Sequence, residues 1–462
     1  MNYIKVKLPN YLFNTRFLNV LFCGFFLLIF CLICTDLTPR KALDTIDYID
    51  ISEKWFEAES VDRRSIGYPI MIWFQKGLFG ENWEYSALYT QIILYVFSAI
   101  IFWFLIESSF NRLPNIFKTI IVLFCFLNPQ SIAFTQVLLP ESYPLFFSLS
   151  SIQLYFWIDL KKTSFKFRNE IFGFLSALFA FISFLLKPIW LLIPISILIS
   201  ELIKMLINKR LAVRVPLYFV FPFFMFYLTF SYYLNVNNQE SLSGVKNINL
   251  NLSFLRMGII QKSNSKLYEY LEKNDLVEYV NNREWTDNLV EYEKFQKLKK
   301  IPKTYLIDSH YWKDAISQKD NYILFFSKSI IRIPCFFSTS AENGNVKIFG
   351  SNLLNYLYQA FYGFIHKNLS FLIVFHFLLI VFLIINKNEV IKNSSFLVVI
   401  SFLVLAFAIA STVFSYQDQI FLRVRAGINP IVIFMFIYPI CYFLSNYKSY
   451  FSKNIFNKKI ET

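Results

Sequence analysis

The sequence has few charged residues for its length, and this scarcity excludes a soluble globular protein. Only 16% of its 462 residues are Asp, Glu, Lys or Arg, whereas 56% are hydrophobic and 20% are aromatic. A soluble domain carries roughly 25% charged residues. With a mean hydropathy of +0.46, the chain has too little polar surface to cover its apolar side chains, so lipid must cover them. These numbers predict a polytopic integral membrane protein.

Histidine and cysteine are also scarce, which argues against a metal centre and against a disulfide framework. The three histidines lie far apart in the sequence and form no H-x-x-x-H or H-E-x-x-H motif. Five of the six cysteines fall in or beside apolar runs, where cysteine is usually a small hydrophobe, and Cys335 alone falls clearly in a loop. Internal repeats are absent too, which weakens the case for a transporter built from inverted repeats.

The net charge of +14 does not indicate a nucleic-acid partner. The basic residues are scattered over many loops, whereas a nucleic-acid site gathers them on one motif or face. Membrane proteins place Lys and Arg in their cytoplasmic loops, and this positive-inside rule explains the excess.

Apolar runs of about 17–22 residues predict spanning helices and an all-α fold. We expect ten spans, near residues 17–34, 87–106, 116–138, 142–159, 170–186, 188–206, 215–235, 368–385, 394–415 and 428–445. Pro140 and Pro188 help to form two of the tight hairpins between them. Residues 352–365 are expected to form an interfacial helix that lies on the membrane.

The loop charges predict that both termini are cytoplasmic. With this topology every short inner segment is net basic, as the positive-inside rule requires, and residues 35–86 and 236–352 face outward. The first apolar run lacks a small-x-small cleavage site, so we expect it to be an uncleaved helix. We divide the chain into a membrane module at 1–235, a mainly helical outer subdomain at 236–352 and a second membrane module at 353–462. A composition rich in Lys, Asn, Ile and Phe is typical of AT-rich bacterial genomes and indicates the bacterial inner membrane.

Ionisable residues gather on the predicted outer side. They comprise the carboxylates of the 35–86 loop and of Glu141, and the cations Arg63, Arg64, Lys187, Arg423 and Arg425. Charges at the edge of hydrocarbon are costly, so we treat them as functional candidates. Acids beside cations suit a substrate that has a phosphate and a hydroxyl to deprotonate, because arginine binds phosphate through a bidentate fork and lysine as a point charge.

The segment 44–57 is predicted to be an interfacial helix that carries carboxylates over the bilayer. Asp44, Asp47 and Tyr48 have i, i+3 and i+4 spacing and therefore share one face. Another face, with Ile46 and Ile49, is apolar enough to lie on the membrane.

Five short motifs resemble, in order, those of the GT-C superfamily of integral-membrane glycosyltransferases, which includes protein O-mannosyltransferases and the aminoarabinose transferase of lipid A. The motifs are DTIDY (44–48), RSIGYP (64–69), Glu141 at the start of the fourth span, Lys187-Pro188, and the Arg423, Arg425 and Pro430 approach to the last span. The resemblance covers most of the membrane part, and the outer segment 236–352 matches only loosely.

The resemblance implies transfer of a sugar from a polyprenyl-phosphate carrier to a lipid, glycan or protein acceptor on the outer face, with inversion. Asp44 would be the general base, with Asp47 as the second choice. The leaving phosphate would be stabilised by Lys187, Arg423 and Arg425, helped by Arg63 or Arg64, while Glu141 would hold a hydroxyl or orient a cation. Tyr48 and Tyr68 would line the substrate site. The scheme needs no metal, although some superfamily members use a divalent ion, for which Asp44, Asp47 and Glu141 have suitable oxygens. We expect a monomer.

Other interpretations stay open at this point. A lipid-linked glycan polymerase or ligase uses the same kind of donor, and a glycan transporter would place its charges near the centres of its spans. Each candidate also has a plain structural role. Asp44 and Asp47 solvate an interfacial helix, Glu141 complements a helix dipole, Lys187 snorkels, and Tyr68 belongs to a turn. Arg423 and Arg425 bind lipid headgroups generally.

Overall fold

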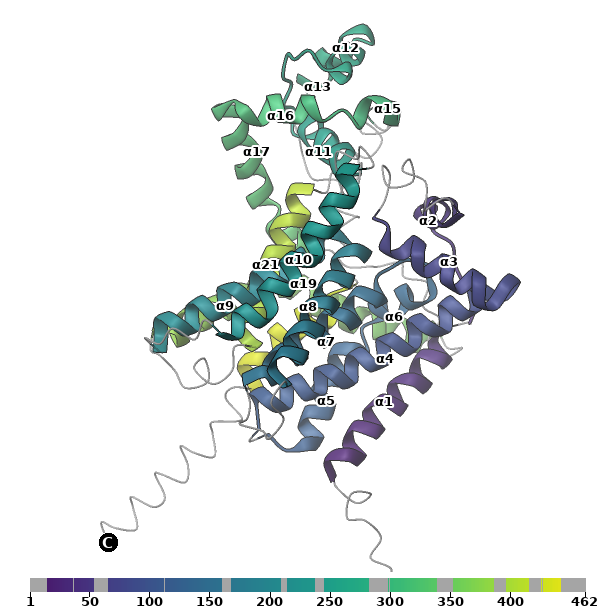
Figure 1. Ribbon diagram of the computed structural model, residues 1–462, viewed down its shortest axis with the longest axis vertical. Helices are drawn as coiled ribbons and strands as arrows, with labels where there is room; N and C mark the ends of the chain where they lie inside the picture. Colours follow the sequence, from purple (N-terminus) through teal and green to yellow (C-terminus); the bar gives the residue numbers. More distant parts are fainter. Residues whose placement is uncertain are drawn as a thin grey trace, which may run out of the picture.

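The fold is all-α, as the sequence predicts (Figure 1). The computed structural model describes residues 15–35, 37–53, 65–111, 113–159, 168–208, 214–236, 245–281, 298, 300–338, 352–385, 396–414, 425 and 427–441. Within these ranges the β contact is a single parallel bridge between Arg40 and Val137.

The helices follow the apolar runs closely in the first part of the chain. They are α1 (Thr15–Cys34), α2 (Leu43–Glu53), α3 (Gly67–Phe79), α4 (Trp83–Ser109), α5 (Asn115–Phe126), α6 (Pro129–Gln136), α7 (Ser142–Asp159), α8 (Arg168–Leu186), η3 (Pro188–Leu191), α9 (Leu192–Asn208) and α10 (Arg214–Val236). The short 3-10 helix η2 (Gly80–Asn82) separates α3 from α4.

The second part alternates short and long helices. They are α11 (Val245–Arg256), α12 (Lys266–Lys273), α13 (Leu276–Asn281), α15 (Lys303–Leu306), α16 (Ser309–Ser317), α17 (Lys319–Ile331), α18 (Ile333–Ser338), α19 (Asn352–Ile385) and α21 (Phe396–Phe414). A further apolar helix covers Asn429–Cys441.

Five of the described helical stretches are long and apolar enough to cross a membrane, or six if a bent pair counts as one span. The five are Thr15–Cys34, Gly67–Ser109, Arg168–Leu186, Pro188–Leu206 and Phe396–Val413, and shorter apolar helices cover Leu217–Tyr233 and Asn429–Cys441. The chain is therefore consistent with a multi-pass membrane protein, while the total of ten spans stays a prediction.

The predicted span 116–138 is not one straight helix. It divides into α5 and α6, whose axes differ by 62°. The break falls at Asn128-Pro129, because proline cannot continue a helix but suits the first position of a new one. The Asn128 side chain caps α6 by accepting a hydrogen bond from the backbone N–H of Ser131 at 3.1 Å.

Three tyrosine hydroxyls satisfy the backbone carbonyls that this break exposes. Tyr95 donates to the carbonyl of Phe126 and Tyr362 to that of Phe124, both at 2.7 Å, and Tyr358 donates to that of Leu127. Irregular backbone at membrane depth is tolerated only where protein groups or water satisfy it. α4 and α19 therefore supply the partners that lipid cannot.

Residues 352–365 do not form a separate interfacial helix. They are the first part of α19, which runs unbroken for 34 residues. At about 1.5 Å per residue α19 is about 51 Å long, well beyond the ~30 Å hydrocarbon core. The predicted interfacial element and the predicted span at 368–385 are one helix, because no proline or glycine pair interrupts the sequence between them.

The long helices share one apolar core and present further apolar side chains outward. Trp103, Phe126 and Trp190 are fully buried in this core, whereas Phe25 on α1 and Phe221 on α10 are each 64% exposed. An exposed phenylalanine surface of this kind is what lipid covers.

A second core joins the short helices α11–α17 into one unit, at the top of Figure 1. It falls in the segment predicted to lie outside the membrane, and we therefore call it the extramembrane unit. Its centre is a parallel stack of Phe254 on Phe325, with ring centroids 4.3 Å apart. The buried Asn251 side chain donates to the carbonyls of Leu306 and Asp308, both at 2.8 Å, and so fixes the connection between α15 and α16.

Candidate functional site

The helix α2 carries the candidate bases and is held to the bundle by its polar face. Thr45 is fully buried and donates to the carbonyl of Leu138 at 2.9 Å, and Tyr48 and Ser52 are buried beside it. Asp44 and Asp47 are half-buried, whereas Asp50 is exposed. The predicted helix is confirmed. Of the isoleucines assigned to its membrane-facing side, Ile46 is exposed, whereas Ile49 packs against the bundle beside Tyr48.

A chain of three tyrosines joins α2 to two other candidate motifs. The ring of Tyr68 makes edge contacts with Tyr48, at 5.1 Å between centroids, and with Tyr143, at 5.7 Å. Tyr48 lies one turn after Asp44, Tyr68 belongs to the Gly-Tyr-Pro step, and Tyr143 lies two residues after Glu141. All three rings are buried. Aromatic pairs of this geometry contribute about 0.5–1.5 kcal/mol each beyond their buried area.

The glycine of the Gly-Tyr-Pro step, Gly67, lies where two backbones come into close contact. A Cβ atom at this position would lie 2.6–2.7 Å from backbone atoms of Leu185 and Leu186 at the end of α8. Only glycine permits so close an approach of two backbones. Next to it, the hydroxyl of Ser65 donates to the carbonyl of Leu186 at 2.9 Å. The step is therefore pressed against the residues that immediately precede Lys187.

Glu141 and Lys187 form an ion pair at the same place. Lys187 Nζ lies 3.1 Å from Glu141 Oε1, and the side chains are 21% and 2% exposed, respectively. The two residues are 46 positions apart, and both lie in hairpins that proline shapes. A nearly buried carboxylate needs such a partner, because removing one member of a buried pair costs about 3–5 kcal/mol.

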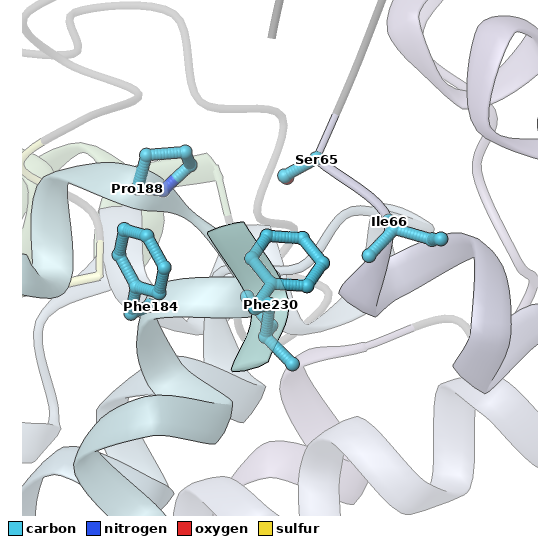
Figure 2. A pocket seen from close by; sticks show the side chains of 6 residues that line it. Ser65, Ile66, Phe184, Pro188 and Phe230 are labelled. Atoms are coloured by element: carbon cyan, nitrogen blue, oxygen red, sulfur yellow. The ribbon is translucent and has the colours of Figure 1, made fainter. Parts of the chain in front are cut away.

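A small, mainly apolar hollow lies between the start of α3, the end of α8, η3 and α10. Ser65, Ile66, Phe184, Leu185, Pro188 and Phe230 line it. Figure 2 shows Phe184 and Pro188 on one side and Ser65 and Ile66 on the other, with Phe230 between them. Its volume of about 10 Å³ is close to the space that one water molecule needs, so it marks an apolar surface next to Lys187 in the sequence and not a ligand pocket.

The strand-like segment after α6 fastens the start of the α2 loop. Arg40 and Val137 form the parallel bridge, with backbone bonds from Arg40 N–H to the carbonyl of Gln136 and from Leu138 N–H to that of Arg40. Lys41 adds an ion pair with Glu84 at 2.6 Å. The position of α2 therefore depends on α6 at one end and on the tyrosine chain along its length.

A second polar cluster surrounds the other end of α6 and was not predicted from the sequence. The Asn429 amide donates to Gln130 Oε1 at 2.8 Å and lies 3.3 Å from Asn128 Oδ1, while Asn128 Nδ2 lies 3.0 Å from His366 Nε2. All four residues are buried. Two Asn-Pro steps at 128–129 and 429–430 were the available signal, since Asn before Pro marks a helix start.

Arg425 belongs to the same region as this second cluster. It is fully buried and donates to the carbonyl of Phe336 in α18 at 2.7 Å. The eight residues of α6 lie between Asn128 and the segment that holds α2, a length of about 12 Å. Arg63, Arg64 and Arg423 lie outside the described residues. The structure places Tyr48, Tyr68, Glu141 and Lys187 together, and of the predicted arginines it places Arg425, which lies with the second cluster.

Among the described residues no three His, Cys, Asp or Glu side chains are grouped as a metal site requires. The described cysteines, Cys23, Cys31, Cys34, Cys125 and Cys441, are free and buried.

No family model, no curated protein and no solved structure matches this chain. Any functional assignment therefore depends on the residues themselves.

Proposed function

We propose that the protein is an integral membrane glycosyltransferase that moves a sugar from a polyprenyl-phosphate carrier to an acceptor on the outer face of a bacterial inner membrane. One observation carries the proposal. Three segments that resemble GT-C motifs, and that are far apart in the sequence, meet through Tyr48, Tyr68 and Tyr143. Candidate bases on α2 and the Glu141–Lys187 pair thereby share one end of the helix bundle.

In this proposal Lys187 binds the phosphate of the donor. Its side chain is one-fifth exposed, so it can reach a ligand while it stays paired with Glu141. A charge held at the edge of an apolar region interacts strongly with an anion, because the local dielectric constant is low. The apolar side chains of Phe184, Pro188 and Phe230 would lie along the first part of the isoprenoid chain.

The carboxylates of α2 would act on the acceptor. Asp44 or Asp47 accepts the proton of the acceptor hydroxyl while that oxygen attacks the anomeric carbon of the sugar. The bond from the anomeric carbon to the phosphate oxygen breaks, its electron pair passes to the phosphate, and the configuration inverts. A positioned base contributes roughly 10²–10⁴-fold to such a step, and cations that stabilise the leaving phosphate contribute through preorganised electrostatics.

The plain structural roles account less well for this arrangement. A snorkelling lysine keeps its charged end in water, whereas Lys187 is paired with an almost fully buried carboxylate. A carboxylate that only complements a helix dipole gains at most about 2 kcal/mol, which is less than the several kcal/mol that burying its charge costs, so its burial calls for another reason. Neither role explains why both groups adjoin the Gly-Tyr-Pro step.

The test compares envelope glycans from cells that carry the wild type, Asp44→Asn or Asp47→Asn, with Asp50→Asn as the matched control. Asp50 is exposed on the same helix, so its change should leave the glycans as in the wild type. Mass spectrometry should show loss of one sugar modification with Asp44→Asn or Asp47→Asn. Unchanged glycans in both of these variants, each made at normal levels, would refute the proposed base.

A further inference from the structure

The helix α17 has an unusual outer surface for an extramembrane element. Tyr322, Ile323, Ile330 and Ile331 are 47%, 51%, 59% and 71% exposed. Tyr322, Phe326 and Ile330 recur every four residues and Ile323 precedes Ile330 by seven, so these side chains share one side of the helix. We call this set, with the half-buried Phe326, the α17 outer face.

The opposite side of α17 is fully committed to the extramembrane unit. Phe325 is buried in the stack with Phe254, and Ser329 is buried beside it. Lys328 Nζ donates to the carbonyl of Met257 at 2.9 Å. The α17 outer face is therefore distinct from the side of the helix that packs in the core of the extramembrane unit.

The last turn of α17 lies at the level where a membrane span ends. Arg332, the residue after α17, donates from Nη1 to the carbonyl of Thr412 at 3.3 Å. Thr412 is in the last turn of α21, and the apolar span on α21 extends to Val413. The chain then continues directly into α18, whose Phe336 is buried in the core of the long helices. Figure 1 shows α17 running from α16 toward the end of α21.

From this geometry we propose that the outer face of α17 docks on the lipid bilayer and anchors the extramembrane unit to it. Ile330 and Ile331 enter the boundary between headgroups and acyl chains, and Tyr322 lies nearer to the aqueous side, where tyrosine is favoured. Lys319 at the start of α17 suits anionic headgroups. The exposed apolar side chains of α17 thus lead upward from the end of the span on α21.

The consequence is a fixed height and orientation of the unit relative to the bilayer. An interfacial helix of this kind gains binding free energy in proportion to the apolar area that it buries in lipid. This inference does not depend on the proposed enzymatic function, because it uses only α17, α21 and the exposure of the side chains between them.

The experiment is site-directed spin labelling of the full chain in nanodiscs of phosphatidylethanolamine and phosphatidylglycerol. Four variants each carry one added cysteine: Ile331→Cys, Ile330→Cys, Ile323→Cys and, as a control, Lys273→Cys on α12 at the far end of the unit. Wild-type protein taken through the same labelling gives the background of the native thiols. Collision rates with oxygen and with a water-soluble nickel chelate then report the depth of each label.

We expect the ratio of oxygen to nickel collisions to be several-fold higher at 330 and 331 than at 273, with position 323 in between. Ratios at 330 and 331 equal to that at 273 would overturn the proposal. Dipolar broadening that grows with the number of chains per disc would overturn it too, because it would show a second copy of the chain on this face.

Discussion

At the residue scale, the ion pair between Glu141 and Lys187 is the feature with the largest energetic consequence. Glu141 is almost fully buried and Lys187 is partly exposed. Removing one partner leaves the other charge in a site that water reaches poorly, while replacing both with Gln and Met leaves an uncharged pair of similar volume. The comparison of single and double variants therefore separates the pair itself from its surroundings.

We predict that Glu141→Gln and Lys187→Met each destabilise the protein. The loss for Glu141→Gln should be about 3 kcal/mol, at the low end of the range for buried pairs, because the Lys187 side chain left without its partner is partly exposed to water. The double variant should lie closer to the wild type than either single variant does. Thermal unfolding in detergent, followed by intrinsic fluorescence, gives the order of the four midpoints. Additive losses in the double variant would show that the pair contributes nothing beyond its separate members.

Two glycines in α3 offer a matched pair of substitutions. A methyl group at Gly67 would meet the backbone of Leu185 and Leu186 at 2.6–2.7 Å, whereas nothing lies within 4 Å of a methyl group at Gly77. Gly67→Ala should lower the unfolding midpoint and open the contact between α3 and α8, because backbone atoms must move. Gly77→Ala should stabilise the helix by about 0.8–1.0 kcal/mol, because alanine has the higher helix propensity, and so raise the unfolding midpoint slightly. Equal midpoints for the two variants would contradict the close approach.

At the element scale, the broken pair α5–α6 positions both polar clusters. Its first end carries Asn128 and the contacts to His366 and Asn429, and the segment after its last residue holds Arg40 and Thr45. The break costs backbone hydrogen bonds, and three tyrosine hydroxyls replace them. The geometry of the candidate site therefore depends on side chains of α4 and α19 that never reach it.

We predict that Tyr362→Phe destabilises the protein by about 1–3 kcal/mol, because the carbonyl of Phe124 loses its partner in a buried place. Tyr356→Phe is the control on the same helix, since Tyr356 is 69% exposed. Thermal unfolding in nanodiscs should show a lower midpoint for the first variant alone. Faster amide hydrogen exchange around residues 124–132 should accompany it, and unchanged exchange there would contradict the capping role.

The extramembrane unit contains a carboxylate that makes its stability depend on pH. Burial alone raises the pKa of Asp308, but hydrogen bonds from the backbone and side chain of His310 and from the backbone of Lys266 outweigh burial and hold the pKa below its usual value. A carboxylate with a depressed pKa in the folded state stabilises that state above its unfolded pKa of about 3.9. This stabilisation is lost as the pH falls through the folded pKa.

We therefore predict that Asp308→Asn weakens the unit at neutral pH and that its difference from the wild type disappears in acid. Asp314→Asn, on the exposed side of α16, should resemble the wild type at every pH. Hydrogen exchange of residues 245–281 and 300–338 across the pH range measures the difference. A difference that stays constant from neutral to acidic pH would refute the role of the ionised carboxylate.

At the scale of the whole molecule, hydropathy predicted the all-α fold and the places of the long helices, because a run of apolar residues in lipid has no alternative to a helix. It did not predict the break at Asn128, where the Asn-Pro signal lies inside an otherwise apolar run. It also divided α19 into two elements, since a fall in hydropathy near 365 does not end a helix. The prediction of a helix over 44–57 is confirmed for the residues up to Glu53, and residues 54–57 lie outside the described part of the chain.

The candidate site could be predicted only in part. Motif resemblance selected Tyr48, Tyr68, Glu141 and Lys187, and these residues share one end of the molecule. The tyrosine contacts and the Gly67 packing that bring them together join residues up to 119 positions apart in the chain, and no local pattern encodes such pairs. The buried amides Asn128 and Asn429 were not predicted, because a single Asn-Pro step indicates a helix start and does not show which distant side chains meet it.

The central claim is that the Glu141–Lys187 pair, together with the apolar side chains of Phe184, Pro188 and Phe230, binds a polyprenyl phosphate. Native mass spectrometry of the purified protein with added polyprenyl phosphate tests it without knowledge of the sugar or the acceptor. The test variant is Glu141→Gln with Lys187→Met, and the control is Glu201→Gln with Lys204→Met, which removes a similarly buried pair on α9. We predict a bound lipid in the wild type and the control and a loss of at least tenfold in occupancy in the test variant, about 1.4 kcal/mol. Equal occupancy in all three proteins would contradict the account.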